Sequence, residues 1–129
     1  MKIKTKLTLG VGLLFLMIII VSIVGAFNIN ALKNDTENIL TANYNSLEYC
    51  RTILDAIENK TGDSWQNLER DLNKQEQNIT EIGEAEATEQ IRINFEQLKL
   101  NPENFEATIK IRNAVFTVMD MNMEAIQRK

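Results

Sequence analysis

The sequence LLFLMIIIVSIV at residues 13–24 decides the architecture of this 129-residue chain. Eleven of these twelve residues are apolar, and the longer stretch from residue 7 to residue 32 contains no charged side chain. An α-helix needs about 20 consecutive apolar residues to cross the hydrocarbon core of a bilayer, because each residue adds about 1.5 Å of length. The sequence therefore predicts a transmembrane helix over residues 7–30.

The flanks of this apolar run predict its orientation. Lys2, Lys4 and Lys6 precede it with no acidic residue among them, and positively charged flanks stay on the cytoplasmic side. We therefore expect residues 1–6 to be a cytoplasmic tail at the inner membrane and residues 31–129 to lie in the periplasm. The alternative is a signal peptide cleaved near Ala26. The run is longer than the about 7–15 apolar residues of a signal peptide, which favours an uncleaved anchor.

Composition narrows the functions open to the body of the chain. Apart from the three N-terminal lysines, eleven Lys and Arg face eighteen Asp and Glu, so residues 31–129 carry a net charge of −7. An acidic body argues against nucleic acid as a partner, although one or two arginines can still bind a small anion. The chain has no histidine and one cysteine, which removes the commonest general base and metal ligand and any internal disulfide. We expect no catalytic residue, no metal site and no cofactor.

Four helical segments follow from the spacing of apolar residues, which alternates between three and four positions. Turn-forming residues at 59–62, 83 and 101–103 separate them. Short connections make consecutive helices antiparallel, so the sequence predicts an all-α, up-down-up-down four-helix bundle whose first helix continues from the membrane. The residues expected to face inward are Ile29, Leu32, Thr36, Ile39, Asn43, Leu47, Cys50, Leu54 and Ile57, then Trp65, Leu68, Leu72, Gln75, Ile79 and Ile82, then Ala87, Ile91, Phe95 and Leu98, and finally Phe105, Ile109, Arg112, Phe116, Met119, Met123 and Ile126.

Local signals predict the ends of these helices. Gly62 can take the left-handed conformation that ends the first helix, and Asp63 or Ser64 can cap the second. The acidic residues of segment 84–89 favour the start of the third helix through their interaction with its dipole. Pro102 disfavours helix at the residue before it, which ends the third helix.

Two large aromatic residues are expected at the membrane-distal end of the bundle. Trp65 begins the second helix and Phe105 begins the fourth, and we expect both side chains to pack there. Cys50 lies on the inward face of the first helix, and we expect it to be a small core residue; an intermolecular disulfide is the alternative.

Three segments resemble a known family: MKIKTKL at residues 1–7, ANYNSLEY at 42–49 and MNMEAIQRK at 121–129. They are similar to the N-terminal region of sensor histidine kinases of the Bacteroides group, whose extracytoplasmic four-helix bundle is similar to that of methyl-accepting chemotaxis receptors. The resemblance covers the whole chain. It implies a homodimer, and it implies that a second membrane span, a HAMP linker and the kinase domains follow the bundle. The fourth helix has no stop signal before Lys129, as expected of a chain that continues.

The sequence therefore predicts the sensor module of a membrane signalling receptor, most simply a two-component sensor histidine kinase. The alternatives are the sensor of a chemotaxis receptor and a non-signalling membrane-anchored adaptor. An enzyme is not expected, because acidic residues scattered along helices form a solvated face and lack the companion groups that catalysis needs. The expected partners are the bilayer, a second copy joined along the first helix near Cys50, and a small anionic ligand or a periplasmic protein.

The predicted ligand site uses Arg112, which interrupts the apolar spacing of the fourth helix, and Arg51 of the first helix. A guanidinium can hold a carboxylate through two parallel hydrogen bonds. Asn43, Tyr44 and Tyr49 are added as more peripheral members of the site. The alternative is that both arginines lie along the surface and reach solvent or pair with carboxylates such as Glu48 or Asp55.

Overall fold

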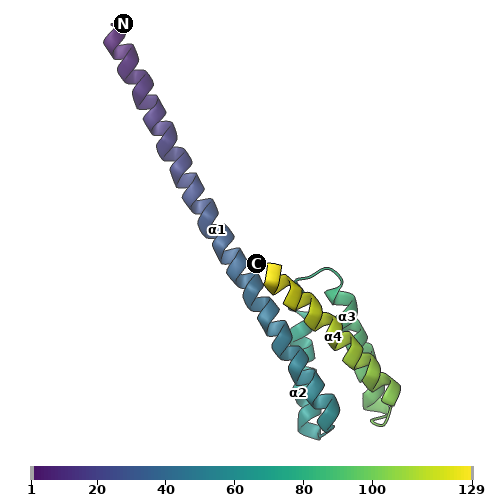
Figure 1. The fold of residues 1–129 in the computed structure, drawn as a ribbon. Helices are drawn as coiled ribbons and strands as arrows, with labels where there is room; N and C mark the ends of the chain where they lie inside the picture. Colours follow the sequence, from purple (N-terminus) through teal and green to yellow (C-terminus); the bar gives the residue numbers. More distant parts are fainter. Residues whose placement is uncertain (1, 129) are drawn as a thin grey trace. The chain divides into compact units, whose positions relative to one another are not determined.

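The computed structural model describes residues 2–128, which form four α-helices and no strand. The helices are α1 (Ile3–Asn59), α2 (Gly62–Glu76), α3 (Glu84–Leu100) and α4 (Phe105–Arg128) (Figure 1). The chain divides into two compact units, Met1–Asn38 and Ile39–Lys129, and α1 contributes to both. The predicted all-α fold class is confirmed.

The first unit consists of the N-terminal part of α1. Its most apolar stretch of 18 residues has a mean hydropathy of 2.9, and none of that stretch is buried. This helix is long and apolar enough to cross a membrane, and it lies near the N-terminus, where a membrane anchor and a signal sequence have the same composition. The chain thus carries a candidate membrane span where the sequence predicts one.

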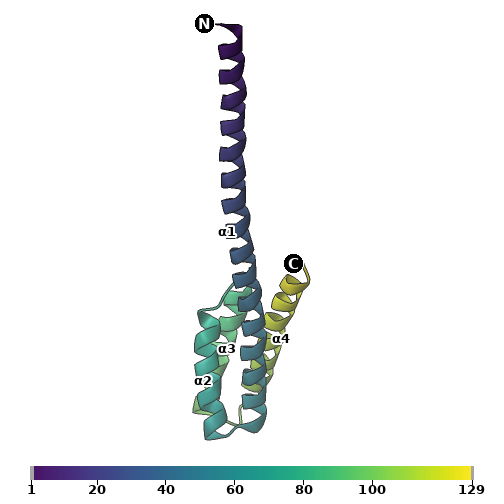
Figure 2. The same cartoon turned by 90° about the vertical axis from the view of Figure 1, so that its left-hand side faces the viewer.

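The second unit is the bundle, in which residues 39–59 of α1 lie side by side with α2, α3 and α4 (Figures 1 and 2). We call the end formed by residues 60–61 and 101–104 the tip. There the Lys60 ammonium donates a hydrogen bond to the carbonyl of Pro102 at 3.1 Å. We call the opposite end, which contains the loop 77–83 and the end of α4, the entry end. Arg128 pairs with Glu81 there at 3.2 Å.

The core of the bundle confirms much of the predicted pattern. Trp65 packs against it near the tip, with its ring centroid 5.6 Å from that of Phe95. Cys50 is fully buried, and burial, together with the charge of Glu84, raises the pKa of its thiol to about 12. The thiol is therefore a core group that cannot reach a second chain while the bundle is closed. The buried apolar residues are Cys50, Ile53, Ala56, Ile57, Leu68, Leu72, Ala87, Ile91, Phe95, Leu98, Ala107, Ile111, Ala114, Val115, Val118 and Ala125.

The predicted inward face of the fourth helix is wrong for most of its residues, although Met119 packs, partly buried, against the core. Phe105 is 73% exposed, and Ile109, Phe116 and Met123 are exposed as well. A second series with the same three–four spacing is buried instead: Thr108, Ile111, Val115, Val118, Asn122 and Ala125. Its residues are smaller, which suits the close backbone approach of α3 and α4. Large side chains are excluded from such a narrow space, so Phe105 does not pack at the tip.

The predicted extent of the first two inward faces also needs correction. The side chains of Ile29, Leu32, Thr36 and Ile39 are exposed, and burial in α1 begins at Asn43. Helix α2 ends at Glu76, so Ile79 and Ile82 lie in the loop 77–83 and are exposed.

The turn between α1 and α2 differs from its prediction in detail. The residue with positive φ is Lys60, at 50°, whereas Gly62 is the first residue of α2. Thr61 caps α2: its hydroxyl accepts a hydrogen bond from the Ser64 amide at 3.2 Å, and the Ser64 hydroxyl accepts one from the Thr61 amide at 2.8 Å. This reciprocal capping satisfies two backbone donors, which outweighs the preference for glycine in the left-handed position. The predicted end of the third helix before Pro102 is confirmed, because Asn101 is extended.

Candidate functional site at the entry end of the bundle

Glu84, the first residue of α3, is fully buried at the entry end. The residue before it, Gly83, has φ of 90°, a conformation that side-chain-bearing residues rarely adopt. This turn brings the chain from the loop into α3. The sequence predicts an acidic residue here that favours the start of the helix through its interaction with the helix dipole, and the structure places its carboxylate among the four helices.

The carboxylate of Glu84 accepts hydrogen bonds from every other helix of the bundle. Its Oε1 atom accepts from the Ser46 hydroxyl of α1 at 3.2 Å, and from the Gln75 amide of α2 and the Asn122 amide of α4, both at 2.8 Å. Its Oε2 atom accepts from the backbone amides of Thr80 and Glu81, at 2.9 and 3.0 Å. One side chain therefore joins α1, α2, α3, α4 and the loop 77–83.

Glu84 is held as a carboxylate without a cation. Burial raises its pKa, but the bonds from Asn122, Thr80, Glu81 and Gln75 lower it more, so that the pKa lies below its ordinary value. None of the ion pairs between residues 2 and 128 involves Glu84. Uncharged donors therefore supply the stabilisation that a buried charge requires.

A second set of hydrogen bonds ties the loop to α1. The Thr80 hydroxyl donates to Asn43 Oδ1 at 2.6 Å. The Asn78 amide donates to the carbonyl of Ala42 at 2.7 Å and to the hydroxyl of Ser46 at 2.9 Å. We call this whole group the entry layer; its members are Asn43, Ser46, Gln75, Asn78, Thr80, Glu84 and Asn122.

Three buried polar atoms of the entry layer have no hydrogen-bond partner in the described part of the chain. They are Asn43 Nδ2, Gln75 Oε1 and Asn122 Oδ1. Each belongs to an amide whose other atom is already bonded. The entry layer is therefore tightly connected but has hydrogen-bonding capacity that it does not use.

The structure distributes the five predicted ligand residues over different surroundings. Asn43 belongs to the buried entry layer, and the ring of Tyr49 faces α2, with the Lys74 ammonium 5.8 Å from its centroid. Arg51 and Tyr44 are exposed on α1, and Arg112 is half-buried on α4. Neither arginine forms an ion pair between residues 2 and 128. Asn43 and Tyr49 thus have contacts inside the bundle, and the ligand role of all five residues stays a prediction.

Two surface hollows have linings that include none of these five residues. An open groove of about 610 Å³ runs between α3 and α4 and is lined by residues that include Glu86, Lys110 and Asn113. A smaller one of about 300 Å³ lies near the tip between α1 and α2 and includes Asp55 and Arg70. Both mix acidic and basic groups, and neither contains Arg51 or Arg112.

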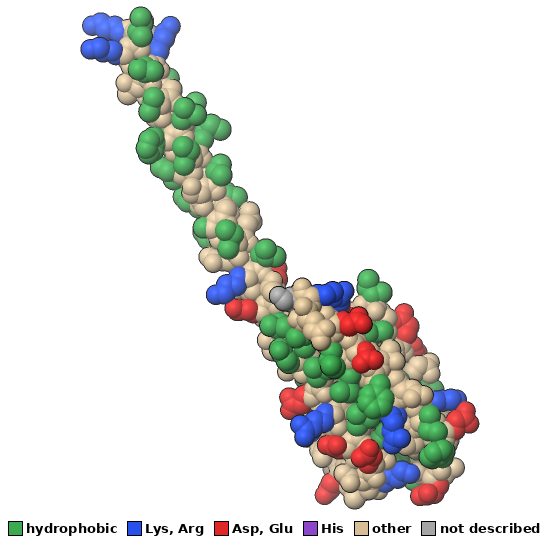
Figure 3. All heavy atoms as spheres, in the orientation of Figure 1, with side chains coloured by type: hydrophobic (Ala, Val, Ile, Leu, Met, Phe, Trp, Pro, Cys, Tyr) green, Lys and Arg blue, Asp and Glu red, His purple; other side chains and the backbone are tan. Residues whose placement is uncertain are grey.

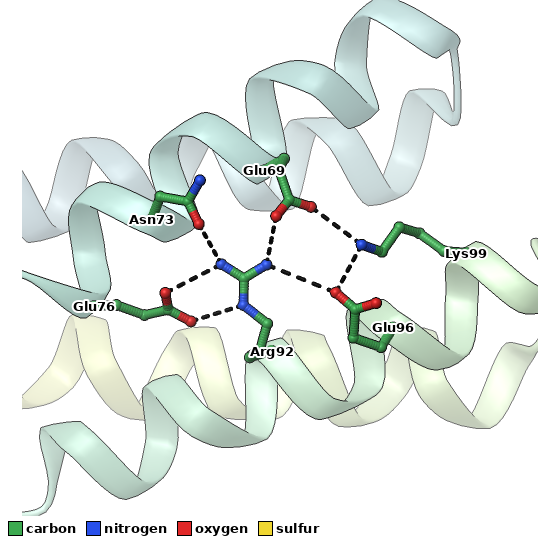
Figure 4. Close-up of polar contacts among 6 residues, drawn as sticks. All are labelled: Glu69, Asn73, Glu76, Arg92, Glu96 and Lys99. Carbon is green, nitrogen blue, oxygen red and sulfur yellow. Dashed lines mark hydrogen bonds and ion pairs between the residues drawn. The ribbon is translucent and has the colours of Figure 1, made fainter.

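A separate ion network joins α2 to α3 on the surface (Figure 4). Arg92 lies at its centre, 2.7 Å from one oxygen each of Glu69 and Glu76. Lys99 adds contacts to Glu69 at 3.4 Å and to Glu96 at 2.7 Å. We call this group the surface network; it comprises Glu69, Asn73, Glu76, Arg92, Glu96 and Lys99. The hydrogen bonds to Glu76 and Glu69 raise the pKa of Arg92.

Sequence reasoning missed the role of Glu84, and one signal could have found it. Gln75 and Asn43 are polar residues at predicted core positions, and Asn122 is a third polar residue on the face that proves to be buried. Buried amides require a polar partner. Gln75 and Asn122 share Glu84 as that partner, and Asn43 bonds to the Thr80 hydroxyl of the same layer.

Comparison with known families supplies the remaining finding. Residues 1–126 match the family described as a four helix bundle sensory module for signal transduction. No curated protein and no solved structure gives a significant match. The family match includes both the candidate membrane span and all four helices of the bundle.

Proposed function

The chain belongs to the family of four-helix-bundle sensory modules for signal transduction, and we propose that it is the extracytoplasmic input module of a membrane receptor. The resemblance of residues 42–49 and 121–129 to sensor histidine kinases supports a two-component kinase as that receptor. The input module itself performs no catalysis in this proposal. A methyl-accepting chemotaxis receptor is the alternative that the family description fits equally well.

The observation that carries the proposal is the hydrogen-bonded path from α1 to α4 through Glu84. Helix α1 contains the candidate span and also supplies Ser46 to the entry layer. Helix α4 supplies Asn122 and ends at Arg128, at the same end of the bundle. A stimulus that moves α4 against α1 must stretch or replace these bonds, so the entry layer couples the two helices that lead toward the membrane in this proposal.

The unused atoms of the entry layer support a second arrangement of the same side chains. Asn43 has an unused donor, and Gln75 and Asn122 each have an unused acceptor, so a small shift of the helices can give these amides a different set of bonds. A layer of apolar side chains has no second set of directional bonds, because a shift of one helix against another only reduces its contacts. A polar layer with two bonding patterns is a suitable two-state element for a sensor.

We propose a small anion as the stimulus, because the guanidinium groups of Arg51 and Arg112 have no carboxylate partner in the described residues. Such an anion would reach Arg51 from solvent, since this side chain is exposed. The substitution Arg112→Ala should leave the bundle folded and remove the response to the stimulus. An unchanged response would reject the anion site and leave the proposal for the entry layer intact.

The entry layer is tested with Glu84→Gln in the complete receptor, with Glu86→Gln as the matched control. Both substitutions remove one negative charge from the first turn of α3, but Glu86 is exposed. We expect Glu84→Gln to change basal autophosphorylation about fivefold or more, as typical coupling free energies allow, and Glu86→Gln to leave it unchanged. Equal output from both variants in a folded receptor would contradict the proposal, and methylation in place of phosphorylation would identify a chemotaxis receptor.

The proposed orientation has its own test. A reporter enzyme that works only outside the cytoplasm should be active when it is fused after residue 129. Recovery of a soluble chain that begins near Phe27 would show cleavage and overturn the anchored arrangement.

A further inference from the structure

Met121 of α4 lies against the turn that brings Glu84 into the bundle. Gly83, the residue before Glu84, has φ of 90°. A Cβ atom placed on Gly83 would lie 3.1 Å from the terminal methyl carbon of Met121 and 3.9 Å from its sulfur. The thioether therefore fills the space in which a side chain at residue 83 would begin. Met121 also precedes Asn122, whose amide donates to Glu84 at 2.8 Å.

Met121 borders a hollow that is open to solvent. The residue is half-buried, and it lines a hollow of about 210 Å³ at the entry end together with Glu81, Ile82, Glu124 and Arg128. Figure 3 shows hydrophobic side chains among charged ones on the face of the bundle that α4 crosses in Figure 1. Apolar groups of this helix are thus not sealed from water, and a small reagent can enter the hollow beside the thioether.

The two neighbouring methionines of α4 have different surroundings. Met119 packs against the core of the bundle. Met123 is 44% exposed and does not line the hollow. Of the three, Met121 is therefore the one that combines access from solvent with a place beside the turn before Glu84.

We propose that Met121 is a site of oxidation to methionine sulfoxide, and that its sulfoxide weakens the hold of the entry layer on Glu84. The oxidant is a peroxide. In the reaction with hydrogen peroxide the O–O bond breaks, one oxygen forms a bond to the sulfur, and the other leaves as water with both protons. The sulfur loses two electrons and the peroxide gains them. The product carries a polar oxygen where an apolar thioether was packed.

The added oxygen acts on both sides of the entry layer. The space beside Gly83 is already filled, so either the turn moves or the side chain of Met121 swings toward the hollow. The same loop holds Glu84, since the Glu81 amide donates to its Oε2 atom at 3.0 Å and the Glu84 amide donates to the Glu81 carbonyl at 3.2 Å. A displaced turn stretches these bonds, and a displaced Met121 moves Asn122. This inference deepens the proposed function, on which its effect on signalling rests.

Two matched variants of the complete receptor in membranes test the reaction itself. Met119→Leu with Met123→Leu retains Met121, whereas Met119→Leu with Met121→Leu retains Met123. Leucine has a similar volume to methionine and contains no sulfur. After limited peroxide treatment, peptide mass spectrometry should find one added oxygen atom on the retained methionine of each variant. A Met121 that stays unmodified while Met123 is fully converted would reject the site.

Receptor output then separates the two methionines. Oxidation of the variant that retains Met121 should shift basal autophosphorylation about fivefold or more, in the direction of Glu84→Gln, and oxidation of the variant that retains Met123 should not. Met121→Gln introduces a polar group without oxidant and should act in the same direction, while Met123→Gln should not. Buried Cys50 is common to all these chains, so it cannot cause the difference. Equal output from the two oxidised variants would overturn the inference.

Two further measurements connect the effect to Glu84. A methionine sulfoxide reductase with dithiothreitol should restore the original output, because the sulfoxide is reducible. In a Glu84→Gln receptor, oxidation of Met121 should add little, because both changes act on the same bonds; a full additional effect would reject the path through Glu84. If oxidised Met121 leaves output unchanged while Glu84→Gln still alters it, the modification site is wrong and the proposed sensory function stands.

Discussion

The entry layer and the surface network both surround one charged side chain with several partners, but they stabilise the bundle by different means. Glu84 is fully buried and bound by uncharged donors, whereas Arg92 is partly exposed and bound mainly by carboxylates. Exposed ion pairs are screened by solvent and contribute little each. A buried carboxylate cannot be rehydrated when a partner is lost, so the entry layer has the larger effect on stability.

The two clusters also join different helices. The surface network holds α2 to α3, while the entry layer adds α1 and α4. In the proposed sensor, α2 and α3 form a pair fixed by surface charges, and α1 and α4 are coupled through one buried group. This division predicts that Glu84 affects both stability and signalling, and that Arg92 affects stability alone.

The largest expected effect is that of Glu84→Ala, which leaves five donors without their acceptor. We expect it to lower the free energy of unfolding by about 3–5 kcal/mol. Urea unfolding of the full chain in detergent, followed by fluorescence of the single tryptophan, Trp65, measures this loss. Glu86→Ala is the control and should change stability by less than about 0.5 kcal/mol. A cost for Glu84→Ala below about 1 kcal/mol would remove the contrast between the two clusters.

A smaller effect is expected for Arg92→Ala. The carboxylates of Glu69 and Glu76 are each more than a third exposed, so water replaces the lost guanidinium, and the expected cost is about 1 kcal/mol. That cost should shrink in about 1 M salt, where the Debye length falls to about 3 Å. The cost of Glu84→Gln should not change with salt. If both costs respond to salt equally, the entry layer is more hydrated than its burial indicates.

The smallest effect concerns pH. The folded pKa of Glu84 lies below its ordinary value, so its contribution is fully present above the unfolded pKa of about 4.3 and is lost as the pH falls through the folded pKa. With no histidine in the chain, stability should be nearly constant between about pH 5 and 8. Below that range Glu84→Gln should lose stability less steeply than Glu86→Gln. Identical acid slopes for these two variants would show that Glu84 is not ionised in the folded bundle.

Helix α4 buries a different face from the one that the sequence predicts, and this explains why Phe105 and Phe116 are exposed rather than buried. Two series of residues on this helix share the same three–four spacing, and the series with the larger side chains, such as Phe105 and Phe116, is the better core by composition alone. The close approach of α3 to α4 reverses this choice, because Val115 and Ala125 fit where Phe116 does not. Periodicity determines that a helix has an apolar face, but the distance to the neighbouring helix decides which face is buried.

The sequence by itself determined the all-α class, the apolar run of α1, the antiparallel order of the helices and the buried face of α3. These follow from local properties: hydropathy over one segment, spacing along one helix, and turn residues between helices. Only the tertiary structure decided the buried face of α4, the end of α2 at Glu76 and the position of Glu84. These depend on which side chains from distant parts of the chain meet. A glutamate that follows a glycine has the same local sequence whether its carboxylate faces water or, like Glu84, is bound by donors from three other helices.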